Sequence, residues 1–185
     1  MAIVKERTKK EVEEKLKGLG DYVKIDYLAS CLRNNIDFDT RKFVLTELSA
    51  LYESKGMFVE AGKLMRNSAD INTTFIGKIS DFMKSAELFS KAGNFEEADI
   101  SISKALASAN TKEKSGIKLK QKLMYMAQAE LLLRKDKRKQ AMGAYEKLLS
   151  FDLTQTEKLN VQNTLLGLYE KLGKIREYMN LKRNL

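Results

Sequence analysis

Residues 93–98 read Gly93-Asn94-Phe95-Glu96-Glu97-Ala98: a glycine, a polar residue, an aromatic residue, two acids and an alanine. Striped apolar stretches flank this segment on both sides, which predicts two helices joined by a tight turn. Glycine suits the turn because it adopts the left-handed backbone that often ends a helix, with no steric penalty from a Cβ atom. The segment therefore predicts a helix–turn–helix unit.

Four further segments repeat this arrangement along the chain. They are Gly20-Asp21-Tyr22, Gly56-Met57-Phe58, Asp136-Lys137-Arg138 and Gly173-Lys174-Ile175. Successive turns, taken in chain order, lie 36, 37, 43 and 37 residues apart. Internal periods of this size are typical of helical solenoids, in which each repeat packs on its neighbours. The fourth turn has aspartate in place of glycine, which is a weaker left-handed residue.

The sequence predicts an all-α, right-handed solenoid of about five repeats that form one domain, residues 1–185. The expected repeats are about 1–35, 39–72, 74–110, 111–153 and 154–185. We expect a charged amphipathic helix over residues 3–19, a second capped by Asp21 and running to about Asn35, and a third capped by Asp39 or Thr40.

The third and fourth repeats illustrate the apolar stripe and the variation in repeat length. The fourth repeat begins with a long helix from Thr111 to Lys135, which accounts for the spacing of 43. The first helix of the third repeat also has an apolar stripe. The stripe consists of Ile76, Ile79, Phe82, Met83, Ala86 and Phe89.

Composition limits the chemistry that the chain can support. It has no proline, no histidine and a single cysteine, Cys31, which lies in an apolar helical stretch. Zinc sites need histidine or several cysteines, so we expect no metal site and no cofactor, and we interpret Cys31 as a buried structural thiol. No apolar stretch is long enough for a membrane span, and the N-terminus lacks the apolar run of a signal peptide. We therefore expect a soluble cytoplasmic protein.

The sequence resembles the tetratricopeptide repeat family. The segment Phe95-Glu96-Glu97-Ala98 and the later Lys104-Ala105-Leu106 are similar to the second helix of that family, with Gly93 before it. The second repeat is similar through Leu48, Tyr52, Gly56, Phe58, Glu60 and Ala61. The units are longer than the 34 residues of the family, and no proline closes any of them.

This resemblance implies that the first helices of the repeats line a groove for a peptide or a partner helix. The residues expected in this partner groove are Phe43, Glu47, Met83, Lys84, Glu87, Met126, Glu130 and Asn163. Methionine suits such a surface because its flexible side chain adapts to apolar partners, although Met83 and Met126 could equally fill gaps between neighbouring helices. A known subfamily binds carboxylates through lysine, asparagine and arginine residues. Thr46, Ala50, Met83 and Glu87 occupy the matching positions, so that clamp is absent.

The net charge of +9 is concentrated between Thr111 and Lys139, which hold ten basic and three acidic residues. The residues of the predicted basic patch are Lys114, Lys118, Lys122, Arg134, Lys137 and Arg138. Such a patch could bind an acidic protein or nucleic acid, or it could be an ordinary solvated face. Its aromatic neighbours Tyr125 and Tyr145 occupy core positions, so it lacks the stacking platforms of single-strand binders.

Enzyme motifs are missing from the sequence. Gly18 and Gly20 form no dinucleotide fingerprint because a third glycine and a preceding strand are absent, and no phosphate-binding loop occurs. We therefore predict a non-enzymatic protein-binding adaptor or scaffold. The alternatives are a nucleic-acid-associated protein that uses the basic patch, and a self-assembling structural subunit, which leaves homo-oligomerisation open.

Overall fold

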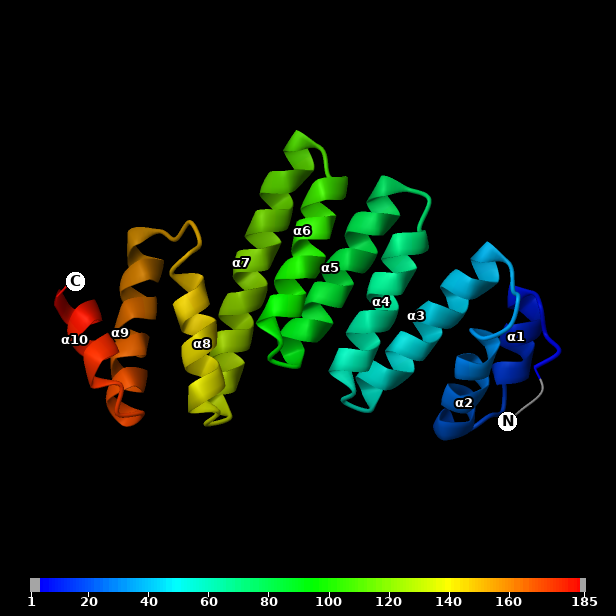
Figure 1. Ribbon diagram of the computed structural model, residues 1–185, viewed down its shortest axis with the longest axis horizontal. Coiled ribbons are helices and arrows are strands. Elements are labelled where there is room, and N and C mark those ends of the chain that lie inside the picture. Colours follow the sequence, from blue (N-terminus) through cyan, green and yellow to red (C-terminus); the bar gives the residue numbers. More distant parts are fainter. Residues whose placement is uncertain (1–3, 184–185) are drawn as a thin grey trace. The chain divides into compact units, whose positions relative to one another are not determined.

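The computed structural model describes residues 4–183, which form helices and no strands (Figure 1). The helices are α1 (Lys9–Leu16), α2 (Asp21–Cys31), α3 (Phe38–Ser54), α4 (Phe58–Ile71), α5 (Phe75–Lys91), α6 (Phe95–Ser108), α7 (Thr111–Arg134), α8 (Arg138–Leu148), α9 (Gln155–Lys171) and α10 (Ile175–Arg183). The prediction of an all-α protein is confirmed. Helices that follow one another in sequence pack in pairs, as expected for helix–turn–helix units.

The chain divides into two compact units, and the division falls inside α7. The N-terminal unit ends at Ile117 and the C-terminal unit begins at Lys118. In the N-terminal unit α4 packs against both α3 and α5, and α5 also packs against α6 (Figure 1). In the C-terminal unit α9 packs against α8 and α10.

The first two helices are shorter than the sequence predicted. The helix expected over 3–19 covers only Lys9–Leu16, because Thr8 and Glu11 form a capping box that starts it (residue 3 lies outside the described residues). The second helix was expected to reach Asn35 but ends at Cys31. Gly20, and not Asp21, is its N-cap. These boundaries were wrong because local capping and turn geometry override apolar periodicity.

The cap of α3 also differs from the prediction. Asp37 is the N-cap, whereas Asp39 or Thr40 was expected. The Asp37 carboxylate accepts hydrogen bonds from the backbone N–H of Thr40 (2.8 Å) and from its hydroxyl (2.8 Å). These bonds hold the pKa of Asp37 below its usual range. Thr40 is the third residue of α3 and is fully buried.

At four of the five turns, the residue at the repeat position adopts the left-handed backbone conformation. Gly56, Gly93 and Gly173 have φ of 75°, 76° and 66°, and Asp136 has φ of 54°. The first position is an exception because the left-handed residue is Gly18 (φ 82°), while Gly20 has φ of −71°. The turn between α1 and α2 is therefore built differently from the later turns.

We expect the substitution Asp136→Gly to raise the free energy of unfolding by up to about 1 kcal/mol, because an L-residue pays a steric penalty in the left-handed region that glycine avoids. Asp136→Ala should lower it by a similar amount, since alanine lacks the local hydrogen bonding that lets aspartate tolerate this conformation. Urea denaturation of the two variants and the parent tests this order. An alanine variant as stable as the glycine variant would contradict it.

The first hydrophobic core of the N-terminal unit joins α1, α2 and α3. Val12, Leu28, Cys31 and Val44 are fully buried in it. Burial raises the pKa of the Cys31 thiol, which keeps it protonated and unreactive at neutral pH. The placement of Cys31 agrees with its interpretation as a structural thiol.

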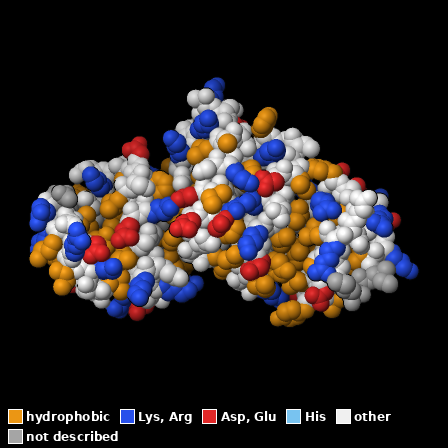
Figure 2. Space-filling model, viewed as in Figure 1, with side chains coloured by type: hydrophobic (Ala, Val, Ile, Leu, Met, Phe, Trp, Pro, Cys, Tyr) orange, Lys and Arg blue, Asp and Glu red, His pale blue; other side chains and the backbone are white. Residues whose placement is uncertain are grey.

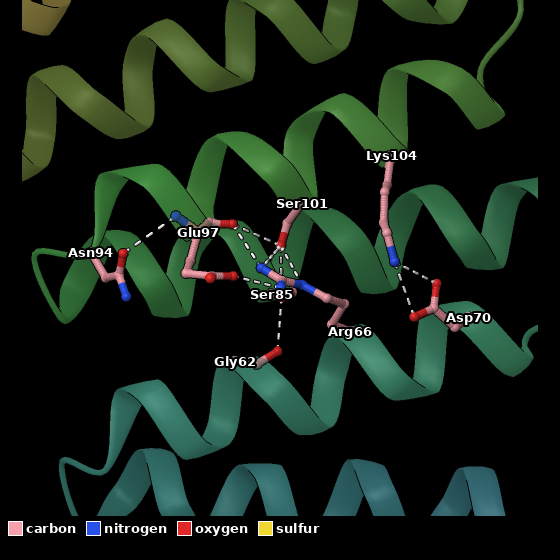
Figure 3. A network of polar contacts seen from close by, with 8 residues as sticks. All are labelled: Gly62, Arg66, Asp70, Ser85, Asn94, Glu97, Ser101 and Lys104. Atoms are coloured by element: carbon pink, nitrogen blue, oxygen red, sulfur yellow. Dashed lines mark hydrogen bonds and ion pairs between the residues drawn. The ribbon is translucent and has the colours of Figure 1, made fainter.

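A polar network joins α4, α5 and α6 (Figure 3). The Arg66 guanidinium donates to the Glu97 carbonyl oxygen (2.8 Å) and to the Ser101 hydroxyl (3.0 Å). Ser85 donates to the Gly62 carbonyl oxygen (2.8 Å). A further ion pair between Lys104 and Asp70 (3.0 Å) joins α6 to α4. The second helices of the second and third predicted repeats are therefore joined by several polar contacts.

In the C-terminal unit, an ion pair and an aromatic contact link one first helix, α7, to another, α9, and to the loop before it. The Lys122 ammonium on α7 lies 3.0 Å from the Glu157 carboxylate on α9. The fully buried ring of Tyr125 packs against Phe151, with 5.5 Å between the ring centroids. These contacts hold α9 and the loop before it against the second part of α7.

Candidate partner-binding surface

The predicted groove residues all lie on first helices of the expected repeats. In the N-terminal unit, α3 carries Phe43 and Glu47, and α5 carries Met83, Lys84 and Glu87. In the C-terminal unit, α7 carries Met126 and Glu130, and α9 carries Asn163. The assignment of these residues to a partner stays a prediction.

An ion network brings α3 and α5 together in the N-terminal unit. Glu53 on α3 lies 3.0 Å from the Lys84 ammonium and 2.7 Å from that of Lys91 on α5. Glu87 in turn lies 2.6 Å from Lys91 and 3.5 Å from Lys84. The structure therefore places two predicted groove residues, Lys84 and Glu87, in one cluster of alternating charge.

Glu53 is a member of this cluster that the groove prediction missed. The prediction counted residues along single helix faces, and Glu53 lies near the C-terminal end of α3, beyond the face that was counted. A comparison of charges between the first helices of adjacent repeats could have found it. Hydrogen bonds from Lys91 and then Lys84 hold the pKa of the Glu53 carboxyl below its usual range.

We expect the Glu53 network to make the N-terminal unit sensitive to acid. The pKa of Glu53 is lower in the folded than in the unfolded state, so its contribution to stability is present above the unfolded pKa and disappears as the pH falls through the folded pKa. The substitution Glu53→Gln should cost about 1 kcal/mol or less at neutral pH, since the pair is partly exposed. The difference from the parent should shrink as the pH falls to about 3.

Thermal unfolding of the parent and of Glu53→Gln at several pH values measures this effect. Glu47→Gln is the matched control, because Glu47 lies on the same helix and makes no ion pair within residues 4–183. A stability difference between the parent and Glu53→Gln that does not change with pH would show that the carboxylate contributes nothing through its charge.

The remaining groove residues of the N-terminal unit are half-buried. Phe43 packs against the core of α1, α2 and α3, and the Lys9 ammonium lies 5.3 Å from its ring centroid. Met83 and Glu47 are partly accessible. The side of the molecule drawn in Figure 2 shows hydrophobic side chains over α3. A partner at this surface would therefore meet apolar atoms beside the ion network.

A small hollow lies over the predicted groove positions of the C-terminal unit. It has a volume of about 190 Å³, and its lining includes Met126, Glu130, Tyr145 and Asn160. Asn163 is exposed on α9 and does not line the hollow. The structure brings Met126 and Glu130 together here and leaves Asn163 apart from them.

Three of the six residues of the predicted basic patch form ion pairs with acidic side chains. Lys122 pairs with Glu157, Arg134 with Glu130 (3.9 Å), and Arg138 with Asp136 (2.7 Å). Three other patch residues are exposed and make no ion pair within the described part of the chain. They are Lys114, Lys118 and Lys137. On the side drawn in Figure 2, basic and acidic side chains are largely intermixed.

Residues 4–183 offer neither a metal site nor a helix suited to a membrane. Residues 4–183 contain no group of three histidine, cysteine, aspartate or glutamate side chains that could hold a metal ion. Within the same residues, no helix has both the length and the apolar character that a membrane crossing requires.

Neither a scan against protein-family models nor a search of the curated proteins finds a match for this sequence. The likeness to tetratricopeptide repeats therefore rests on the residues themselves.

Proposed function

We propose that the chain is a non-enzymatic adaptor or scaffold that binds a peptide or helix of another protein along its first helices. The right-handed solenoid of about five tetratricopeptide-like repeats, acting in the cytoplasm, belongs to this proposal. The observation that carries it is the ion network that joins α3 to α5, in which Glu53 and Lys91 order Lys84 and Glu87 next to the partly accessible Met83.

The chemistry of this surface suits a peptide that combines apolar and charged side chains. Met83 can adapt its shape to an apolar partner residue. Lys84 and Glu87 are held in place before binding, so a partner that pairs with them causes less loss of side-chain entropy. Both signs of charge are present, which favours a mixed sequence over a purely acidic one.

The substitution Met83→Glu should weaken partner binding at least about tenfold, because it places a charge where an apolar contact is proposed. A partner is first isolated by cross-linking to the tagged parent protein in its native cells, and its affinity is then titrated with purified protein. Met57→Glu is the matched control, since Met57 is an exposed residue in the turn before α4. Circular dichroism checks that both variants keep their helices.

An unchanged affinity in the Met83→Glu variant would reject the proposed surface. The same titrations at several salt concentrations test the nucleic-acid alternative. A binding constant that falls steeply with salt, together with loss of binding after Lys114, Lys118 and Lys122 are replaced by glutamate, would favour that alternative.

A further inference from the structure

The outer face of α2 carries four residues in a single line. Tyr22, Asp26, Ala29 and Arg33 follow the i, i+4, i+7, i+11 spacing of one helix face, with Arg33 just past the last residue of the helix. Tyr22 is 75% exposed, and its neighbour Val23 is 55% exposed. Large apolar side chains are therefore left uncovered beside two charged ones.

A hollow of about 610 Å³ lies beside this line, between α1 and α2. Leu19, Val23 and Ala29 give it an apolar lining, and Lys15, Asp26 and Arg33 add charged groups. A hollow with apolar walls and charges of both signs is typical of a protein interface more than of a site for a simple ion.

The two charges on the line differ in their pairing from the nearby charge of Asp21. Asp21, one turn before Asp26, pairs with Lys55 at 2.7 Å. Asp26 and Arg33, in contrast, make no ion pair within residues 4–183. They are seven residues apart, which corresponds to about 10 Å along a helix and is too far for a direct pair.

We propose that this face binds a second copy of the chain, with the two α2 helices antiparallel about a two-fold axis. Asp26 then lies opposite Arg33 of the partner subunit, and Arg33 lies opposite the partner subunit's Asp26. A two-fold interface is self-complementary by symmetry, so the acid and the base of this α2 line give two ion pairs, while Lys15, the third charged group at the hollow, lies on α1 outside the line. Ala29 and Ser30 lie at the midpoint, where small side chains let the helices approach closely.

Charge complementarity favours a second copy over other partners. Asp26 would repel a purely acidic ligand, and Arg33 would repel a purely basic one. The exposed rings of Tyr22 gain apolar contacts near the ends of the crossing. One helix face is a small interface, so we expect a dissociation constant in the micromolar range or weaker.

This inference goes beyond the proposed function and uses a different surface. The groove residues lie on α3, α5, α7 and α9, whereas the dimer face lies on α2 with the adjoining part of α1. Failure of one proposal therefore leaves the other standing. Met83→Glu should not change self-association, and substitutions at Asp26 should not change partner capture through the groove.

Sedimentation velocity over a range of concentrations tests the dimer by charge reversal. The parent should dimerise, and Asp26→Arg or Arg33→Asp alone should weaken the dimer at least about tenfold, because each places like charges together at both ends of the crossing. An equimolar mixture of the two variants should recover association, as should the variant that carries both substitutions. Asp39→Arg, on the exposed start of α3, is the control and should dimerise like the parent.

Three outcomes would overturn the proposal. The parent could remain monomeric at the highest attainable concentration. Either single variant could dimerise as well as the parent. The mixture and the double variant could both stay monomeric while circular dichroism shows intact helices.

Discussion

Replacing Phe89 by alanine is expected to lower the free energy of unfolding by about 3 to 5 kcal/mol, the usual cost of removing a buried phenylalanine ring. Phe89 is fully buried near the C-terminal end of α5. Its ring fills the space above Gly62 of α4, where an added Cβ would lie 3.1 Å from the ring carbons. The Arg66 guanidinium also lies 4.7 Å from the ring centroid. The substitution therefore leaves a cavity and removes the surface on which Arg66 rests.

Phe75→Ala is the matched control for this prediction. Phe75 is the first residue of the same helix, but its side chain is 71% exposed. Its removal should change the free energy of unfolding by less than about 0.5 kcal/mol. Urea denaturation of both variants, followed by far-ultraviolet circular dichroism, gives the comparison. Equal losses of unfolding free energy in the two variants would mean that packing of the buried Phe89 ring does not stabilise the fold.

The position of Phe89 shows what periodicity can predict. The apolar stripe of the third repeat included Phe82, Ala86 and Phe89, and all three are buried. The same stripe included Ile76, which is 76% exposed because it lies in the first turn of α5. The spacing of apolar residues thus identifies which face of a helix is buried. How far the burial extends along the helix depends on where the neighbouring helices stop.

The N-terminal region shows where the repeat pattern misleads. Gly20 occupies the repeat position, yet Gly18 is the left-handed residue and Gly20 caps α2. Gly18 and Gly20 lie within three residues of each other, and the spacing of the repeats does not show which of them adopts the left-handed conformation. Later turns have one candidate each, and there the predicted residue, including Asp136, adopts the expected conformation.

Contacts of the candidate surface depend on pairs that are far apart in sequence. The placement of Lys84 and Glu87 on a first helix followed from the pattern, but Glu53, which pairs with Lys84, lies 31 residues before it. The bond from Arg66 to Ser101 spans 35 residues. Such pairs depend on how one repeat packs on the next, and no single-helix pattern carries that information.

Gly77→Ala is expected to lower the free energy of unfolding by about 1 to 3 kcal/mol through the loss of buried hydrogen bonds. An added Cβ at Gly77 would lie 2.3 Å from Nδ2 of Asn72. Asn72 is buried and donates to Asp81 (3.1 Å), and its side-chain oxygen accepts from the backbone N–H of Thr74 (3.3 Å). The substitution must therefore displace a side chain that links the end of α4 to the start of α5.

A glycine-to-alanine change inside a helix ordinarily stabilises a protein by up to about 1 kcal/mol, so the expected sign is reversed at Gly77. Gly143→Ala in α8 is the control, since nothing lies within 4 Å of its added Cβ, and it should stabilise. In an Asn72→Ala background the cost of Gly77→Ala should disappear, because the obstructing side chain is gone. A cost that persists in that background would place its origin in the backbone of α5 and not in the contact with Asn72.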